Sequence, residues 1–91
     1  MDDFYILETM GQVLKKQRLL QRKTQGQVVE AVKGVSFALY ENIEEDFYTP
    51  STDTAKAICD YLQIDWNKFL SKFREEFKDR AEKNKLNRGK R

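Results

Sequence analysis

The chain contains no histidine and a single cysteine, Cys59, among its 91 residues. One cysteine cannot form a disulfide within the chain. Without histidine, neither a Cys/His zinc site nor a Ser-His-Asp or Cys-His catalytic group can be assembled. The carboxylates form no motif with a nucleophile, a metal spacing or a phosphate loop, so we expect no metal, no cofactor and no enzymatic activity. Cys59 shares an apolar helical face with Ala55, Ile58 and Leu62, which indicates a buried structural thiol.

Proline and glycine are also scarce, with one and four residues. Few chain breaks and little alternation of β-branched residues favour an all-α fold, and the length suits one small domain. No run of about 18 apolar residues is present, so we expect no membrane-spanning segment. The N-terminal stretch starts with acidic residues and lacks the basic region of a signal peptide, which favours a cytoplasmic protein.

Acidic and basic side chains are segregated along the chain, although the formal net charge is only +2. Residues 24–65 carry two basic and eight acidic side chains, whereas residues 66–91 carry ten basic and four acidic ones. From residue 83 onward no acidic residue occurs. We therefore expect one domain over residues 1–82 and a basic tail over 83–91 that is frayed or disordered.

The stretch Thr24–Ile43 has the pattern of two short helices joined by a tight turn. Thr24 is a good N-cap, and the valines that follow it recur at helical spacing. Gly34 favours the end of this helix, because glycine accepts the left-handed conformation at low cost. Ser36 is the next N-cap. This order predicts a helix-turn-helix, in which the second helix enters the major groove of DNA.

Apolar spacing and capping residues predict the remaining helices. The five expected helices span about Asp3–Gln21, Gln25–Val32, Phe37–Glu45, from Ser51 or Thr52 to Leu62, and an apolar stripe of Trp66, Phe69, Leu70, Phe73 and Phe77 that Asp65 caps. Phe73 and Phe77 are too apolar for an exposed helix end. They either cover the first helix, near Phe4, Tyr5 and Leu7, or meet a second chain.

Several short motifs occur in the order of a known family. They are Arg18, Thr24-Gln25, Gly34-Val35-Ser36, Ile43-Glu44 and Pro50-Ser51. On these motifs the chain resembles the phage-repressor, Cro-like (XRE) helix-turn-helix family from about Gly11 to Leu70. The resemblance implies a five-helix lambda-repressor-like DNA-binding domain. It also implies a small repressor-type transcriptional regulator, of a kind found in phages, plasmids and other mobile elements, that binds two half-sites as a homodimer.

The resemblance implies roles for individual residues. Arg18 braces the domain with Glu44 as its partner, and Gln25 contacts a phosphate. Base contacts are expected from the exposed face of the second helix of the motif, at Ser36, Phe37, Ala38, Glu41 and Asn42. An Asn can read adenine, a Glu can accept from cytosine, and Phe or Ala can touch a thymine methyl group. Phosphate contacts are expected from Arg22, Lys23, Thr24, Gln25, Lys33 and Tyr48, and from the tail residues Lys83, Lys85, Arg88, Lys90 and Arg91.

The chain departs from the family pattern at three points. Asp46 stands at the usual glycine position, and Phe47 and Tyr48 follow it where Lys or Arg is usual. Ser36 comes one residue late, so an extra residue, Lys33, either lengthens the preceding helix or widens the turn. A further position that is normally apolar holds Lys23, and Leu20 is expected to fill the vacated core site.

The acidic cluster Glu41–Asp46 supports a second hypothesis, because it would repel phosphates. The scaffold is then a protein-interaction module, whose acidic face with an exposed Phe37 binds a basic or apolar groove of a partner protein. The expected partners are therefore double-stranded DNA, a second copy of the chain or a partner protein, and no membrane.

Overall fold

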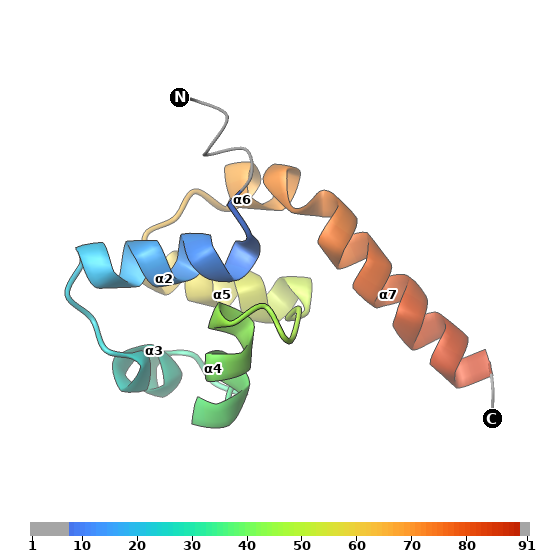
Figure 1. Cartoon of the computed structure of the whole chain (residues 1–91), viewed down its shortest axis with the longest axis horizontal. Helices are drawn as coiled ribbons and strands as arrows, with labels where there is room; N and C mark the ends of the chain where they lie inside the picture. The colour runs from blue at the N-terminus through green and yellow to red at the C-terminus, as the bar shows by residue number, and fades with distance from the viewer. Residues whose placement is uncertain (1–7, 90–91) are drawn as a thin grey trace.

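The computed structural model describes residues 8–89, with side chains through Glu82. Over this range it contains six helices and no strand, so the predicted all-α fold is confirmed. The helices are α2 (Met10–Leu20), α3 (Gln25–Ala31), α4 (Phe37–Glu44), α5 (Thr52–Tyr61), α6 (Trp66–Lys72) and α7 (Arg74–Gly89) (Figure 1). The expected fifth helix is divided in two, because Phe73 leaves the helical conformation and ends α6.

The first helix begins later than the sequence pattern predicts. Glu8 and Thr9 are not helical, so a continuous helix from Asp3 is wrong. Thr9 caps α2 instead: its hydroxyl accepts from the backbone N–H of Gln12, and the Gln12 side chain accepts from the backbone N–H of Thr9. This reciprocal pair satisfies two donors that a helix start otherwise leaves unpaired.

The connection between α3 and α4 is widened by its extra residue. α3 ends at Ala31 rather than Val32, which is already extended, and Lys33 lies in the turn that follows. Gly34 has a φ of 86°, the left-handed conformation that glycine adopts at low cost. Ser36 then caps α4 by accepting from the backbone N–H of Leu39, as predicted.

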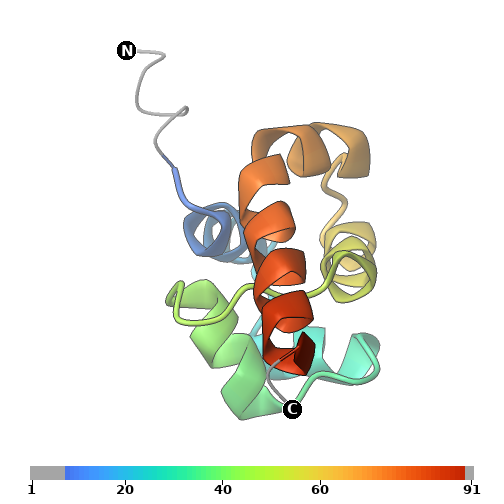
Figure 2. The same cartoon turned by 90° about the vertical axis from the view of Figure 1, so that its right-hand side faces the viewer.

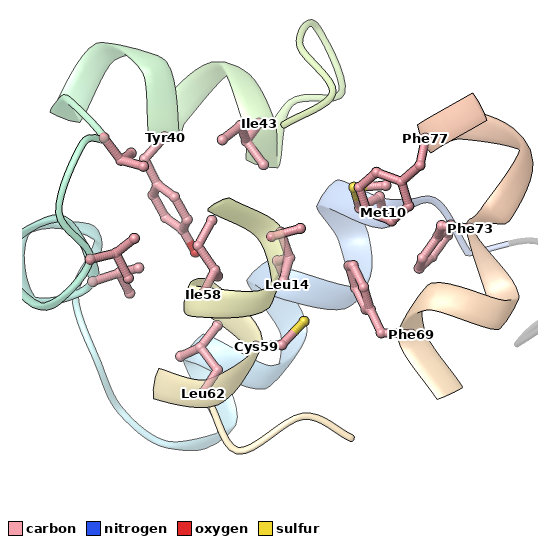
Figure 3. Packing of buried hydrophobic residues seen from close by; sticks show 14 residues of the cluster. Met10, Leu14, Tyr40, Ile43, Ile58, Cys59, Leu62, Phe69, Phe73 and Phe77 are labelled. Atoms are coloured by element: carbon pink, nitrogen blue, oxygen red, sulfur yellow. The ribbon is translucent and has the colours of Figure 1, made fainter. Parts of the chain in front are cut away.

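The core is formed by apolar side chains from all six helices (Figure 3). Cys59 is buried there as expected, and burial raises the pKa of its thiol to about 12. Phe73 and Phe77 are also buried, and Figure 3 shows them beside Met10 of α2. These two rings therefore pack within the chain on the start of the first helix, while Phe4, Tyr5 and Leu7 lie outside the described residues.

Leu20 does not fill a core site, because 67% of its surface is exposed. The half-buried Lys23 side chain packs beside Tyr61 instead, with its Nζ 4.7 Å from the centre of the Tyr61 ring. A long lysine stem can cover apolar surface while its charged end stays near water. The expected compensation by Leu20 is therefore wrong.

α2 and α4 cross at Gly11. A Cβ atom at this position would lie 2.4 Å from the backbone oxygen of Glu44, so no side chain fits between the two helices. This close approach sets how α4 sits against α2. α7 leaves the other helices at its C-terminal half, as the two views show (Figure 1, Figure 2). Its backbone is helical to Gly89, so residues 83–89 of the expected frayed tail continue α7.

Candidate nucleic-acid interface

α4 has one buried and one exposed face. Its buried residues are Tyr40, Ile43 and Glu44. All five residues predicted to contact bases are exposed, namely Ser36 at the N-cap and Phe37, Ala38, Glu41 and Asn42 on the helix. The outward face therefore consists of the side chains that the helical period selected from the sequence.

A buried ion pair holds α4 against α2. Arg18 donates from Nε to Glu44 Oε2 at 2.7 Å and from Nη2 to Oε1 at 3.0 Å, so the pairing implied by the resemblance is confirmed. Nη1 of Arg18 also donates to the backbone oxygen of Lys23 at 2.9 Å. Burial alone would raise the pKa of Glu44, but its hydrogen bonds, above all those from Arg18, outweigh burial and lower the pKa. The Arg18 side chain therefore links α2 to α4 and to Lys23, which lies just before α3.

Two further side chains approach this pair. Gln25 donates from Nε2 to Glu44 Oε1 at 3.0 Å. The Tyr40 hydroxyl is buried and makes no hydrogen bond to a described residue, and its burial and the neighbouring Glu44 carboxylate raise its pKa. The amide nitrogen of Gln25 carries two N–H groups. One of them is used in the hydrogen bond to Glu44, and the other remains.

A groove beside the N-terminus of α3 gathers four of the eleven predicted phosphate contacts. It has a volume of about 520 Å³, and its walls are formed by Arg18, Leu19, Arg22, Lys23, Thr24, Gln25, Gly26 and Phe37. Four predicted phosphate residues thus meet one predicted base residue, Phe37, in a single hollow. Arg22 has a φ of 57°, which turns the chain out of α2 and into this groove.

Lys33 and Tyr48 do not line this groove. Lys33 is exposed in the turn between α3 and α4. Tyr48 lies in the loop after α4, where its hydroxyl accepts from Nη2 of Arg80 at 2.9 Å. The six predicted phosphate contacts outside the tail therefore lie in three places: the groove, the turn between α3 and α4, and the loop after α4.

The acidic cluster is also divided. Asp46 has a φ of 65°, the left-handed backbone conformation that glycine adopts at low cost. Its carboxylate accepts from the Thr9 hydroxyl at 2.6 Å and from the backbone N–H of Gly11 at 2.9 Å. Two of the four acidic side chains in this cluster are thus held by α2 and the residue before it, Glu44 in the interior and Asp46 at the surface. Glu41 and Glu45 are exposed as well.

Arg80 is the basic residue that sequence reasoning missed. It lies on α7 and donates from Nε to the backbone oxygen of Thr49 at 2.7 Å, in addition to its bond to Tyr48. Its guanidinium lies 5.7 Å from the centre of the Tyr48 ring. No local pattern marks Arg80 among the ten basic residues of 66–91, because only the packing of α7 brings it to the loop after α4.

The tail residues can be placed only in part. Lys83, Lys85 and Arg88 belong to the helical backbone of α7, whereas Lys90 and Arg91 lie outside the described residues. Over the part of the chain that the structure describes, no group of His, Cys, Asp and Glu side chains could hold a metal ion. None of the helices described has the length and apolar character needed to cross a membrane.

Comparison with protein-family models, with curated proteins and with solved structures finds no match to this chain.

Proposed function

We propose that this protein binds double-stranded DNA in a sequence-specific manner and acts as a small transcriptional regulator of repressor type. The observation that carries the proposal is the exposed face of α4. Its side chains differ in hydrogen-bonding character, and it stands beside a groove that contains Arg22 and Lys23. A helix of this size fits the major groove, where each base pair presents a distinct set of donors and acceptors.

The charges of the site support this proposal better than the sequence alone. Phosphate contacts need positive charge, since they supply most non-specific affinity. Arg22 and Lys23 provide it on one side of α4. Of the carboxylates that would oppose it, Glu44 is paired with Arg18 inside the domain, whereas Asp46 accepts hydrogen bonds from Thr9 and Gly11 but stays exposed. The repulsion that remains comes from Glu41, Glu45 and Asp46.

Each exposed residue of α4 has a role in this proposal. Asn42 reads an adenine through paired hydrogen bonds, and Glu41 accepts from a cytosine N4 amino group. Phe37 and Ala38 contact thymine methyl groups near the start of the helix. Two copies of the chain, bound to half-sites about 34 Å apart, would read a palindromic operator.

The substitution Asn42→Ala tests the reading of bases. We expect it to weaken binding to a selected duplex by about 1–3 kcal/mol, because one bidentate base contact is lost. Binding to random DNA should hardly change. The measurement is fluorescence anisotropy with a duplex selected from a random library. Asn67→Ala on α6 is the matched control, since Asn67 is also exposed but lies outside the motif. Equal affinity of Asn42→Ala and the unaltered protein for the selected duplex would contradict the assignment.

A second candidate function is supported by exposed aromatic side chains. Phe37 is 49% and Phe47 79% exposed, and both lie near the exposed carboxylates Glu41 and Glu45. Such a surface also suits a partner protein with a basic or apolar groove. The two functions differ in a simple observation. A DNA-binding protein enriches particular duplexes from a random library, whereas a protein-interaction module binds all duplexes weakly and loses them as salt rises.

A further inference from the structure

The loop after α4 contains no basic residue between Glu44 and Pro50, yet a cation reaches it from α7. We propose that Arg80 and Tyr48 form a second phosphate-binding site, which takes the DNA backbone on the opposite side of α4 from the Arg22–Lys23 groove. This inference rests on the proposed DNA-binding function. It assigns Arg80, a residue 36 positions beyond the end of α4, to the interface.

The geometry holds Arg80 in place before any ligand arrives. Its Nε donates to the backbone oxygen of Thr49 at 2.7 Å, and its Nη2 donates to the Tyr48 hydroxyl at 2.9 Å. Two anchors on neighbouring loop residues fix the plane of the guanidinium. Because a guanidinium has five N–H groups, three donors remain for an oxyanion ligand.

Tyr48 contributes a donor to the same site. Its hydroxyl oxygen already accepts from Arg80, so its own proton is available to an acceptor outside the domain. The Tyr48 side chain is part-exposed at 39%, and Arg80 is half-buried. A phosphate oxygen can therefore meet one hydroxyl donor and the charged fork together.

The acidic neighbours of Arg80 do not occupy it. Glu76 precedes it by four residues on α7, a spacing that favours an ion pair on a helix. Among the described residues, however, Arg80 forms no ion pair, and its hydrogen bonds go to Thr49 and Tyr48 instead. Asp46, two residues from Tyr48, has its carboxylate bound by Thr9 and Gly11. The positive charge of Arg80 thus stays available at the surface.

The position of α7 matches this role. In the view of Figure 1, the α2–α3 connection and α7 lie on different sides of α4. Arg22 and Lys23 belong to that connection and Arg80 to α7, so the two cations come from different elements that flank α4. Phosphate contacts fix the register and orientation of a protein on the duplex, so a second contact beyond α4 helps to hold the reading helix in place. The cation for this contact comes from α7.

The test is the salt dependence of DNA affinity, measured by anisotropy with the full chain. We expect Arg80→Gln to lower affinity for selected and random duplexes alike and to reduce the slope of log K against log salt by about one unit. Arg80→Lys should restore that slope, since the charge returns, but not the full affinity, since the fork is lost. Tyr48→Phe should lower affinity and leave the slope unchanged.

Lys78→Gln is the matched control, because Lys78 is exposed on α7 and lies about 200° around the helix from Arg80. An unchanged slope in Arg80→Gln, or the same slope change in Lys78→Gln, would overturn the inference. So would a loss of affinity that tracks a lower melting temperature and is not relieved by Arg80→Lys. If the unaltered protein selects no duplex at all, the proposed function itself fails, whereas loss of selectivity in Asn42→Ala alone leaves that function intact.

Discussion

Glu44 and Asp46 differ from Glu41 and Glu45 in what surrounds their carboxylates. The first two accept hydrogen bonds from α2 and the residues before it, at distances of 2.6–3.0 Å. The other two, Glu41 on α4 and Glu45 at its C-cap, are exposed, and Asp46 is exposed as well despite its hydrogen bonds. All four lie within six consecutive residues and look equivalent in the sequence.

This difference shows that the charge of a segment is not the charge of its surface. Glu44 lies at the buried edge of α4 and faces α2, Glu41 lies three residues earlier at the exposed edge, and Asp46 follows the helix, where its left-handed backbone brings its carboxylate to Thr9 and Gly11. The two bonded carboxylates, called inward below, help to hold the domain together, whereas Glu41 and Glu45, called outward, are exposed. The predictions below test this division, beginning with the inward residue that is most buried.

Glu44→Gln should have the largest effect on stability. The Glu44 side chain is only 1% exposed. Replacing its carboxylate with a neutral amide leaves the charged Arg18 buried without an ionised partner. Breaking a buried ion pair on one side costs about 3–5 kcal/mol, and we expect a value near the lower limit because the amide still accepts a hydrogen bond. Urea denaturation measures this change in the free energy of unfolding. A loss no greater than that of the control Glu45→Gln would show that the pair does not hold α4.

The same pair predicts a dependence of stability on pH. The pKa of Glu44 is lower in the folded protein than its ordinary value of 4.5. Its contribution to stability is therefore complete above pH 4.5 and disappears as the pH falls through the lowered value. Denaturation midpoints between pH 7 and pH 2 should show a smaller acid-induced loss in Glu44→Gln than in the unaltered protein. Parallel pH profiles of the two proteins would contradict this.

Asp46→Ala should have a smaller effect, about 1–3 kcal/mol. It removes two acceptors and leaves the part-buried N–H of Gly11 unpaired. Alanine is also unfavourable at a φ of 65°. Asp46→Gly is the informative partner variant, since it removes the same hydrogen bonds but accepts this backbone conformation, and it should be less destabilising. Glu45→Gln alters an outward carboxylate and should change the free energy of unfolding by less than about 0.5 kcal/mol. If Asp46→Ala changes it equally little, the two kinds of carboxylate do not differ.

Much of the fold was predictable because its signals are local. The caps Thr24, Ser36, Ser51 and Asp65 each accept a backbone N–H of the first turn that follows. Each cap residue and the backbone N–H from which it accepts are only three residues apart, so a short stretch of sequence contains both partners. Of the candidate site, the outward face of α4 was equally accessible, because it follows from the period of a single helix.

Two expectations failed for different reasons. The first helix starts at Met10, where Thr9 and Gln12 form a capping box; this signal is as local as the other caps, but the apolar spacing favoured a longer helix and concealed it. Leu20 was expected in the core because Lys23 occupies a position where an apolar residue was expected. Lys23 covers this region instead, because its side chain packs near Tyr61, which is 38 residues away.

The sequence by itself determined the helices, the turn at Gly34 and the residues that α4 presents outward, since caps, glycine conformation and helical period act over a few residues. The tertiary structure decided which charged side chains are held by distant parts of the chain. Asp46 is held by Thr9 and Gly11 across 37 and 35 positions, and Arg80 reaches Tyr48 across 32. Such contacts depend on how whole helices pack, because the free energy that fixes them comes from the shared core and not from any neighbouring residue.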